Sequence, residues 1–239
     1  MGVDAVIFDW GGTLTPWHTV DIRACWRAVA RVLDPDRAED VAERLLAAEA
    51  ALWARVRTDH ASATVDEVFT LAELTVGPDV LTERALPELF AFWEPYTHSD
   101  PAVLPLFRAL RSRGIRIGVL SNTLWPRTEH ERVLQRDGLL ELIDGAVYSS
   151  EIPWAKPHPE AFRAALAAVD VVEPGRVVFV GDRLFEDVHG ARSVGMRAVH
   201  VPHSAIPASE RGHTQGVPDA VVPRLSELLG LVDSWRVAP

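Results

Sequence analysis

The sequence predicts an α/β protein in which a doubly wound parallel sheet carries a small all-helical second domain. Short apolar segments alternate with helical patterns from residue 100 onward, as strands and crossover helices do in a parallel sheet. A similar apolar segment opens the chain at residues 3–8. Residues 16–97 show helical spacing only, and this stretch is too long for a single crossover connection. We therefore expect a sheet domain over residues 1–15 and 98–239 and a helical domain over residues 16–97.

Composition limits the class of protein. The chain has 239 residues, is 48% hydrophobic and carries a formal net charge of -10, which argues against a nucleic-acid partner. Cys25 is the one cysteine, so no internal disulfide can form. No uninterrupted apolar segment reaches the roughly 18 residues that a membrane span needs. We expect a cytoplasmic enzyme or binding protein without a membrane partner, and the composition predicts no oligomeric state.

The first expected strand ends in an acid. The apolar run stops abruptly at Asp9, and Gly11 and Gly12 follow. This pattern predicts a buried strand that delivers a carboxylate to a loop at its carboxyl end, where open α/β sheets hold their ligands. A carboxylate at that place can act as nucleophile, base or metal ligand. Asp9 could also simply cap a turn, and the strand alone leaves both interpretations open.

Helical spacing follows over residues 21–33 and 36–57. Thr64 and Glu67 have the spacing of a capping box and predict the start of a third helix. A fourth helix is expected over residues 82–93 despite Pro87.

The α/β alternation returns after residue 100. Expected strands cover residues 115–120, 145–149, 176–180 and 197–201. Expected helices run through residues 104–110, after residue 122, and over 159–169, 186–194 and 225–231. Residues 202–218 are expected to form a surface loop.

Polar residues stand at the ends of three of these strands. Asp9, Ser121 with Asn122, and Asp182 should meet at one edge of a parallel sheet. Carboxylates with a backbone carbonyl suit Mg²⁺, and Asp187 lies one helical turn beyond Asp182 to supply another oxygen. Ser121 and the following amides could hold phosphate oxygens at a helix start. Helix capping is the alternative for Ser121, Asp182 and Asp187.

Lys156 is the single lysine among 24 basic residues other than histidine, and it stands between Pro153 and Pro157. An ammonium group is a compact charge that a guanidinium cannot replace in a tight site. This favours a function for Lys156 in offsetting the negative charge of a nucleophile and a phosphate, over a plain surface position.

Four ordered segments now resemble the motifs of the haloacid dehalogenase superfamily. They are Phe8-Asp9-x-x-Gly12-Thr13-Leu14, Ser121-Asn122, Lys156-Pro157, and Gly181-Asp182 with Asp187. The resemblance implies a Rossmann-like core, an aspartyl-phosphate formed on Asp9, and stabilisation of Asp9 by Lys156. It implies Mg²⁺ as cofactor, held by Asp9, the carbonyl of Gly11, Asp182 and Asp187. It also implies binding of the transferred group by Gly12, Thr13, Ser121 and Asn122, and it makes the helical domain a cap over the site.

Gly11 departs from the phosphatase pattern, in which a second Asp two residues after the nucleophile protonates the leaving group. General acid catalysis contributes about 10²- to 10⁴-fold in rate, so its loss matters. The first interpretation is a Mg²⁺-dependent phosphatase for a small phosphorylated metabolite that uses good leaving groups or borrows an acid such as His18 or Asp21.

The second interpretation is a relative with different chemistry, either like phosphonoacetaldehyde hydrolase or like a haloacid dehalogenase. The segment from Asp9 to Thr13 resembles that of phosphonoacetaldehyde hydrolase, but that enzyme needs a cap lysine, which residues 16–97 lack. Haloacid dehalogenases also lack the second Asp, but they use no metal and lack the Gly181-Asp182 form. A binding protein without turnover is the third interpretation.

Four tryptophans lie near the motif loops: Trp10, Trp17, Trp125 and Trp154. They form either an apolar entrance to the site or ordinary core packing.

Overall fold

The computed structural model describes residues 2–202 and 215–237. Within them, six parallel strands form one sheet in the order β3-β2-β1-β4-β5-β6. The strands are β1 (Ala5–Phe8), β2 (Arg116–Ser121), β3 (Gly145–Tyr148), β4 (Val177–Gly181), β5 (Arg197–His200) and β6 (Ala220–Val221). The predicted α/β class with a doubly wound parallel sheet is confirmed. Because all strands are parallel, their carboxyl ends lie at one edge of the sheet.

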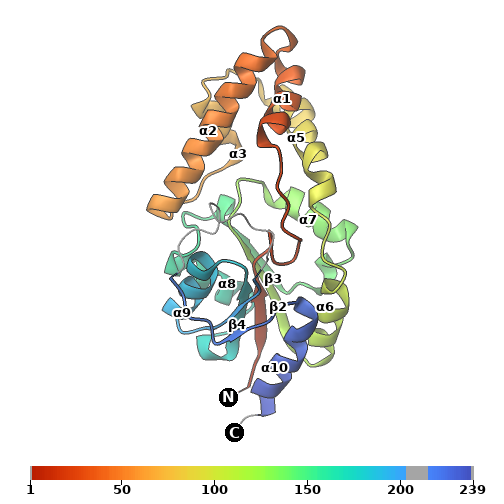
Figure 1. The fold of residues 1–239 in the computed structure, drawn as a ribbon, viewed down its shortest axis with the longest axis vertical. Coiled ribbons are helices and arrows are strands. Elements are labelled where there is room, and N and C mark those ends of the chain that lie inside the picture. Colours follow the sequence, from red (N-terminus) through yellow and green to blue (C-terminus); the bar gives the residue numbers. More distant parts are fainter. Residues whose placement is uncertain (1, 203–214, 238–239) are drawn as a thin grey trace.

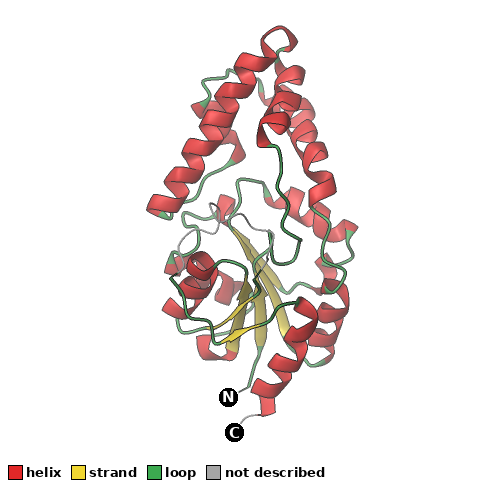
Figure 2. Ribbon diagram, viewed as in Figure 1, coloured by secondary structure: helices red, strands yellow, loops and turns green. Residues whose placement is uncertain are grey.

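Helices cover both faces of the sheet (Figure 2). Side chains alternate along β1, so Val6 and Phe8 enter one buried cluster while Ala5 and Ile7 enter the other. The first cluster includes α6 (Val103–Ser112), part of α7 (Arg127–Arg136) and α10 (Leu228–Val237). The second includes α8 (Pro159–Ala168) and α9 (Gly190–Ser193). Strands buried on both faces explain why the sequence shows apolar runs there instead of strict alternation.

The first five helices after β1 gather beyond the carboxyl ends of the strands (Figure 1). They are α1 (Ile22–Leu33), α2 (Ala38–Asp59), α3 (Val65–Leu71), α4 (Pro78–Val80) and α5 (Leu86–Trp93). Helices α1, α2, α3 and α5 share a third buried cluster, which Leu124 and Ala155 enter from loops of the sheet domain. The capping box is confirmed, because the Thr64 side chain accepts from the Glu67 amide and the Glu67 side chain accepts from the Thr64 amide.

Several boundaries differ from expectation. The helix expected over residues 82–93 is a π-helical turn, Leu81–Ala85, that continues directly into α5, with Pro87 in the first turn of α5. A π-helical segment, Leu184–His189, likewise precedes α9. Strand β6 was not predicted. The expected surface loop lies largely outside the described residues. No helix in the described ranges has both the length and the apolar character to cross a membrane.

Candidate active site

Lys156 lies at the centre of a buried charged cluster. Its Nζ donates to Asp9 Oδ1 at 2.5 Å and to Asp187 Oδ1 at 2.7 Å, and the three side chains are almost fully buried. Burial alone would lower the pKa of Lys156, but attraction by Asp187 and Asp9 outweighs it and holds the pKa above its usual value. Burial also raises the pKa of Asp9 to about 6, against the lowering effect of Lys156. Lys156 is therefore a core residue of the site and not a surface lysine.

Asp182 contributes a buried carboxylate whose oxygens are available to bind a cation. Among the described residues, neither of its oxygens has a hydrogen-bond partner, and the ion pair seen there is with Arg183 Nε at 3.3 Å. Oxygens of Asp9, Asp182 and Asp187 all lie within 4.8 Å of one another. Burial, and then the charges of Asp9 and Asp187, raise the pKa of Asp182 well above its usual value. A buried acid that lies next to two other acids and accepts no hydrogen bond from the described residues fits a hard divalent cation such as Mg²⁺.

Gly12 makes the approach of Asp182 possible. Its φ of +88° lies in the left-handed region, and a Cβ at this position would stand 2.8 Å from Asp182 Oδ2. The hydroxyl of Thr13 is buried and has no hydrogen-bond partner among the residues that the structure describes. Gly11 differs from its neighbour: it is exposed, its φ is not positive, and a Cβ there would meet nothing within 4 Å. The backbone thus requires glycine at position 12 but not at position 11.

Asp187 and Asn122 both orient Lys156. Asp187 uses one oxygen on Lys156 Nζ and the other on the Arg183 amide at 2.9 Å, so it holds the lysine in place. Asn122 donates to the Lys156 carbonyl at 2.9 Å and accepts from the Lys156 amide at 2.7 Å. Ser121 is buried at the end of β2. The side-chain amide of Asn122, expected to bind the transferred group, is thus engaged with the backbone at Lys156.

A buried network that sequence reasoning missed supports the loop after Ser121. Ser149 Oγ accepts from the Thr123 amide at 2.9 Å and donates to the Thr123 carbonyl at 3.0 Å. Thr123 Oγ1 in turn lies 2.9 Å from His130 Nε2. The available signal was the helical spacing of His130 with Val133 and Leu134, which marks the buried face of α7.

His18 and Asp21, suggested as replacements for the missing general acid, each contact a neighbouring group. Asp21 Oδ1 accepts from the Ala24 amide at 2.9 Å and caps the amino end of α1. The ring of exposed His18 packs against Tyr96, with centroids 5.6 Å apart.

Only two of the four tryptophans near the motif loops pack against each other. The ring centroids of Trp10 and Trp125 lie 5.9 Å apart. Trp17 lies beneath the Arg183 guanidinium, and Trp154 stacks on His158.

Comparison with known proteins decides the family. A family model described as haloacid dehalogenase-like hydrolase matches residues 3–195. The chain belongs to the haloacid dehalogenase-like hydrolases. It is therefore a hydrolase of the haloacid dehalogenase superfamily, and the fold described above is the Rossmann-like fold of that family.

Among the curated relatives of this hydrolase is the glyceraldehyde 3-phosphate phosphatase of Methanopyrus kandleri, 28% identical over 96% of this chain and 97% of the relative. The phosphoserine phosphatase of Thermus thermophilus is 31% identical over 66% of this chain and 65% of the relative. Among solved structures, a haloacid dehalogenase-type phosphatase from Thermococcus onnurineus has a TM-score of 0.68 and 26% identity, covering 98% of this chain and 100% of the other. A 2-haloacid dehalogenase from Pseudomonas syringae also has a TM-score of 0.68, at 23% identity over 98% and 99%, and shows the shared fold alone.

Proposed function

We propose that this hydrolase is a Mg²⁺-dependent phosphatase that acts on a small phosphorylated metabolite through an aspartyl-phosphate on Asp9. The observation that carries the proposal is Asp182, a buried acid beside two further acids that has no hydrogen-bond partner in the described part of the chain. Three carboxylates face the cations Lys156 and Arg183, so one more cation is needed to balance them if all are ionised. Several relatives named as phosphatases support the same reaction class.

Asp9 is proposed as the nucleophile. A carboxylate oxygen of Asp9 attacks phosphorus, an O–P bond forms, and the bond from phosphorus to the leaving oxygen breaks. Water then attacks the phosphorus of the aspartyl-phosphate, which releases phosphate and restores Asp9. Asp187 holds the Lys156 ammonium and Asn122 holds the Lys156 backbone. The ammonium neutralises charge on Asp9 and on the phosphoryl oxygens.

The cation would be held by Asp9, the Gly11 carbonyl and Asp182, with Asp187 adjoining them. Bound there, Mg²⁺ would supply positive charge for the phosphoryl oxygens. Gly12, Thr13 and Ser121 are proposed to bind those oxygens, through backbone amides and the two buried hydroxyls.

Residues 16–97 are proposed to act as a cap. Their helices stand beyond the sheet edge that carries Asp9 and Asp182 (Figure 1). The Val65 amide donates to the Leu124 carbonyl at 2.8 Å, which ties α3 to the loop after Ser121. A cap in this place would exclude water from the acyl phosphate and would contact the part of the substrate that leaves.

A metal-independent dehalogenase is the second candidate, favoured by the absence of an acid at Gly11. A dehalogenase reaction would need only a carboxylate nucleophile and one lysine. This candidate therefore does not explain why three acids cluster in the site. Phosphate release from a panel of phosphate esters, measured with Mg²⁺ and with EDTA, separates the candidates. The phosphatase predicts release that EDTA abolishes. Chloride release from a 2-haloacid that survives EDTA would support the dehalogenase instead.

A further inference from the structure

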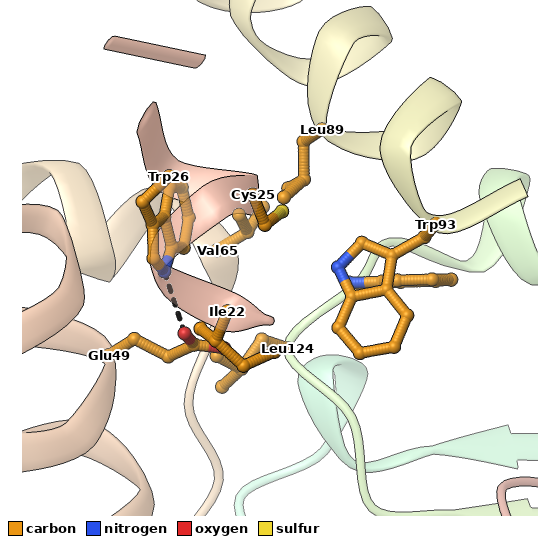
Figure 3. Close-up of a pocket in the computed structure, with 9 residues that line it drawn as sticks. Ile22, Cys25, Trp26, Glu49, Val65, Leu89, Trp93 and Leu124 are labelled. Carbon is orange, nitrogen blue, oxygen red and sulfur yellow. Dashed lines mark hydrogen bonds between the residues drawn. The ribbon is translucent and has the colours of Figure 1, made fainter. Parts of the chain in front are cut away.

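A pocket within the helical segment lies next to the proposed site. Helices α1, α2, α3 and α5 and the loop after β2 line it, and its cavity volume is about 10 Å³. Figure 3 shows Glu49 and Trp26 meeting on one side and Trp93 facing them from the other. Trp125 also lines the pocket, and it packs against Trp10, the residue directly after Asp9. The wall of this pocket is therefore in contact with the loop that carries the proposed nucleophile.

Glu49 is an isolated negative charge in an apolar setting. Its Oε2 accepts from Trp26 Nε1 at 2.7 Å, and Trp53 also hydrogen-bonds its side chain. Burial raises the pKa of Glu49, and no basic side chain of residues 2–202 and 215–237 contributes to the shift. Neutral indole donors satisfy hydrogen bonds but do not neutralise the charge. Among the described residues that line the pocket, none is basic.

The other wall residues add to a negative potential. Burial, Glu49 and Glu88 raise the pKa of Cys25 to about 12, so its thiol stays neutral. The indole rings of Trp26, Trp93 and Trp125 also line the pocket, and aromatic rings attract a cation that lies over their faces. A carboxylate among aromatic rings is a combination that binds an ammonium group.

The cavity limits the size of that group. A volume of about 10 Å³ is close to the smallest that holds one water molecule. A primary ammonium has the size of a water molecule and can place its N–H donors on Glu49. A trimethylammonium group is several times larger and would not fit without movement of the walls.

We propose that this pocket binds the primary ammonium group of the substrate, so that the hydrolase acts on phosphate monoesters of small amino alcohols. The inference rests on the proposed phosphatase function, which places the phosphate at Asp9. It assigns Glu49 as the residue that selects the substrate.

The test compares two ligand series in the Asp9→Asn variant, which binds esters without turning them over. Calorimetry with Mg²⁺ measures Kd for ω-aminoalkyl phosphates of two to five carbons and for n-alkyl phosphates of equal length. A charge-assisted hydrogen bond predicts that at least one amino ester binds about tenfold or more tightly than its alkyl partner. Its trimethylammonium analogue should show no such gain.

Adding Glu49→Gln, which keeps the shape and removes the charge, should abolish the difference between the series. Glu43→Gln is the matched control, because Glu43 lies on the same helix with its side chain half exposed, and it should preserve the difference. Equal affinity of the two ester series for the Asp9→Asn variant overturns the inference and leaves the proposed function standing. So does a preference that survives Glu49→Gln, or an equal gain for the trimethylammonium ester. Failure of every ester of both series to bind contradicts the proposed function and this ligand class together.

Discussion

At the scale of single residues, the adjacent Gly11 and Gly12 differ in whether the structure requires a glycine. Gly12 has positive φ, and a Cβ there would clash with Asp182, whereas the φ of Gly11 is not positive and a Cβ there would meet none of the described residues within 4 Å. Gly12→Ala should therefore destabilise the protein and weaken metal binding, and Gly11→Ala should do neither. Thermal unfolding with and without Mg²⁺ measures both effects. Equal behaviour of the two variants would contradict this account of the loop.

The open space at Gly11 also permits a direct test of the missing acid. Without an acid, turnover should fall steeply as the leaving group becomes more basic. Gly11→Asp should fold normally and raise the rate for alkyl phosphates by up to about 10²-fold, with little change for activated aryl phosphates. Gly11→Asn is the matched control, since it has nearly the same shape and no acidic proton. If wild type already hydrolyses alkyl phosphates as fast as aryl phosphates, another acid serves and this explanation fails.

Lys156 should not tolerate replacement by arginine. Its ammonium contacts Asp9 and Asp187 at once inside the core, and a planar guanidinium cannot make both contacts in the same volume. Lys156→Arg should lower kcat by about 10²- to 10³-fold, the effect of losing one preorganised charge contact. Steady-state kinetics on a variant shown to be folded by circular dichroism provide the measurement. A near-normal kcat would remove Lys156 from the chemistry.

At the scale of elements, α7 supports the loop after β2 through a histidine that stays neutral. Burial, with a smaller contribution from Arg127, lowers the pKa of His130 from 6.5 to about 3. Between these values the unfolded chain binds a proton that the folded chain excludes, so stability falls as the pH drops below about 6.5. When the pH is lowered from 7 to 5, the free energy of unfolding should fall in both proteins. The fall should be about 2 kcal/mol smaller for His130→Gln than for wild type. Urea unfolding at the two pH values tests this, and an equal loss in both proteins would contradict it.

At the scale of the whole molecule, the fold could be predicted because its signals are local. Each buried strand is a short apolar run, and Asp9 and Asp182 follow directly at the ends of two of them. The parallel arrangement then brings both acids to one edge. Strand β6 could not be predicted because its two residues are too few to show a pattern.

The parts of the candidate site that sequence reasoning missed depend on contacts between distant residues. Asn122 and Lys156 are 34 positions apart, and nothing in either segment shows that the Asn122 amide binds the Lys156 backbone. The Thr123 network likewise joins two different loops and a helix. Such contacts follow from tertiary packing, which local patterns do not encode.

The central claim is that Asp9 becomes phosphorylated during turnover. Acid quenching with a ³²P-labelled ester, followed by peptide mapping, tests it most directly. The account predicts an acid-stable, alkali-labile label on the peptide that contains Asp9, present with Mg²⁺ and absent with EDTA or in Asp9→Asn. Steady phosphate release by wild type with no label on that peptide, or unchanged release by a folded Asp9→Asn variant, would contradict it.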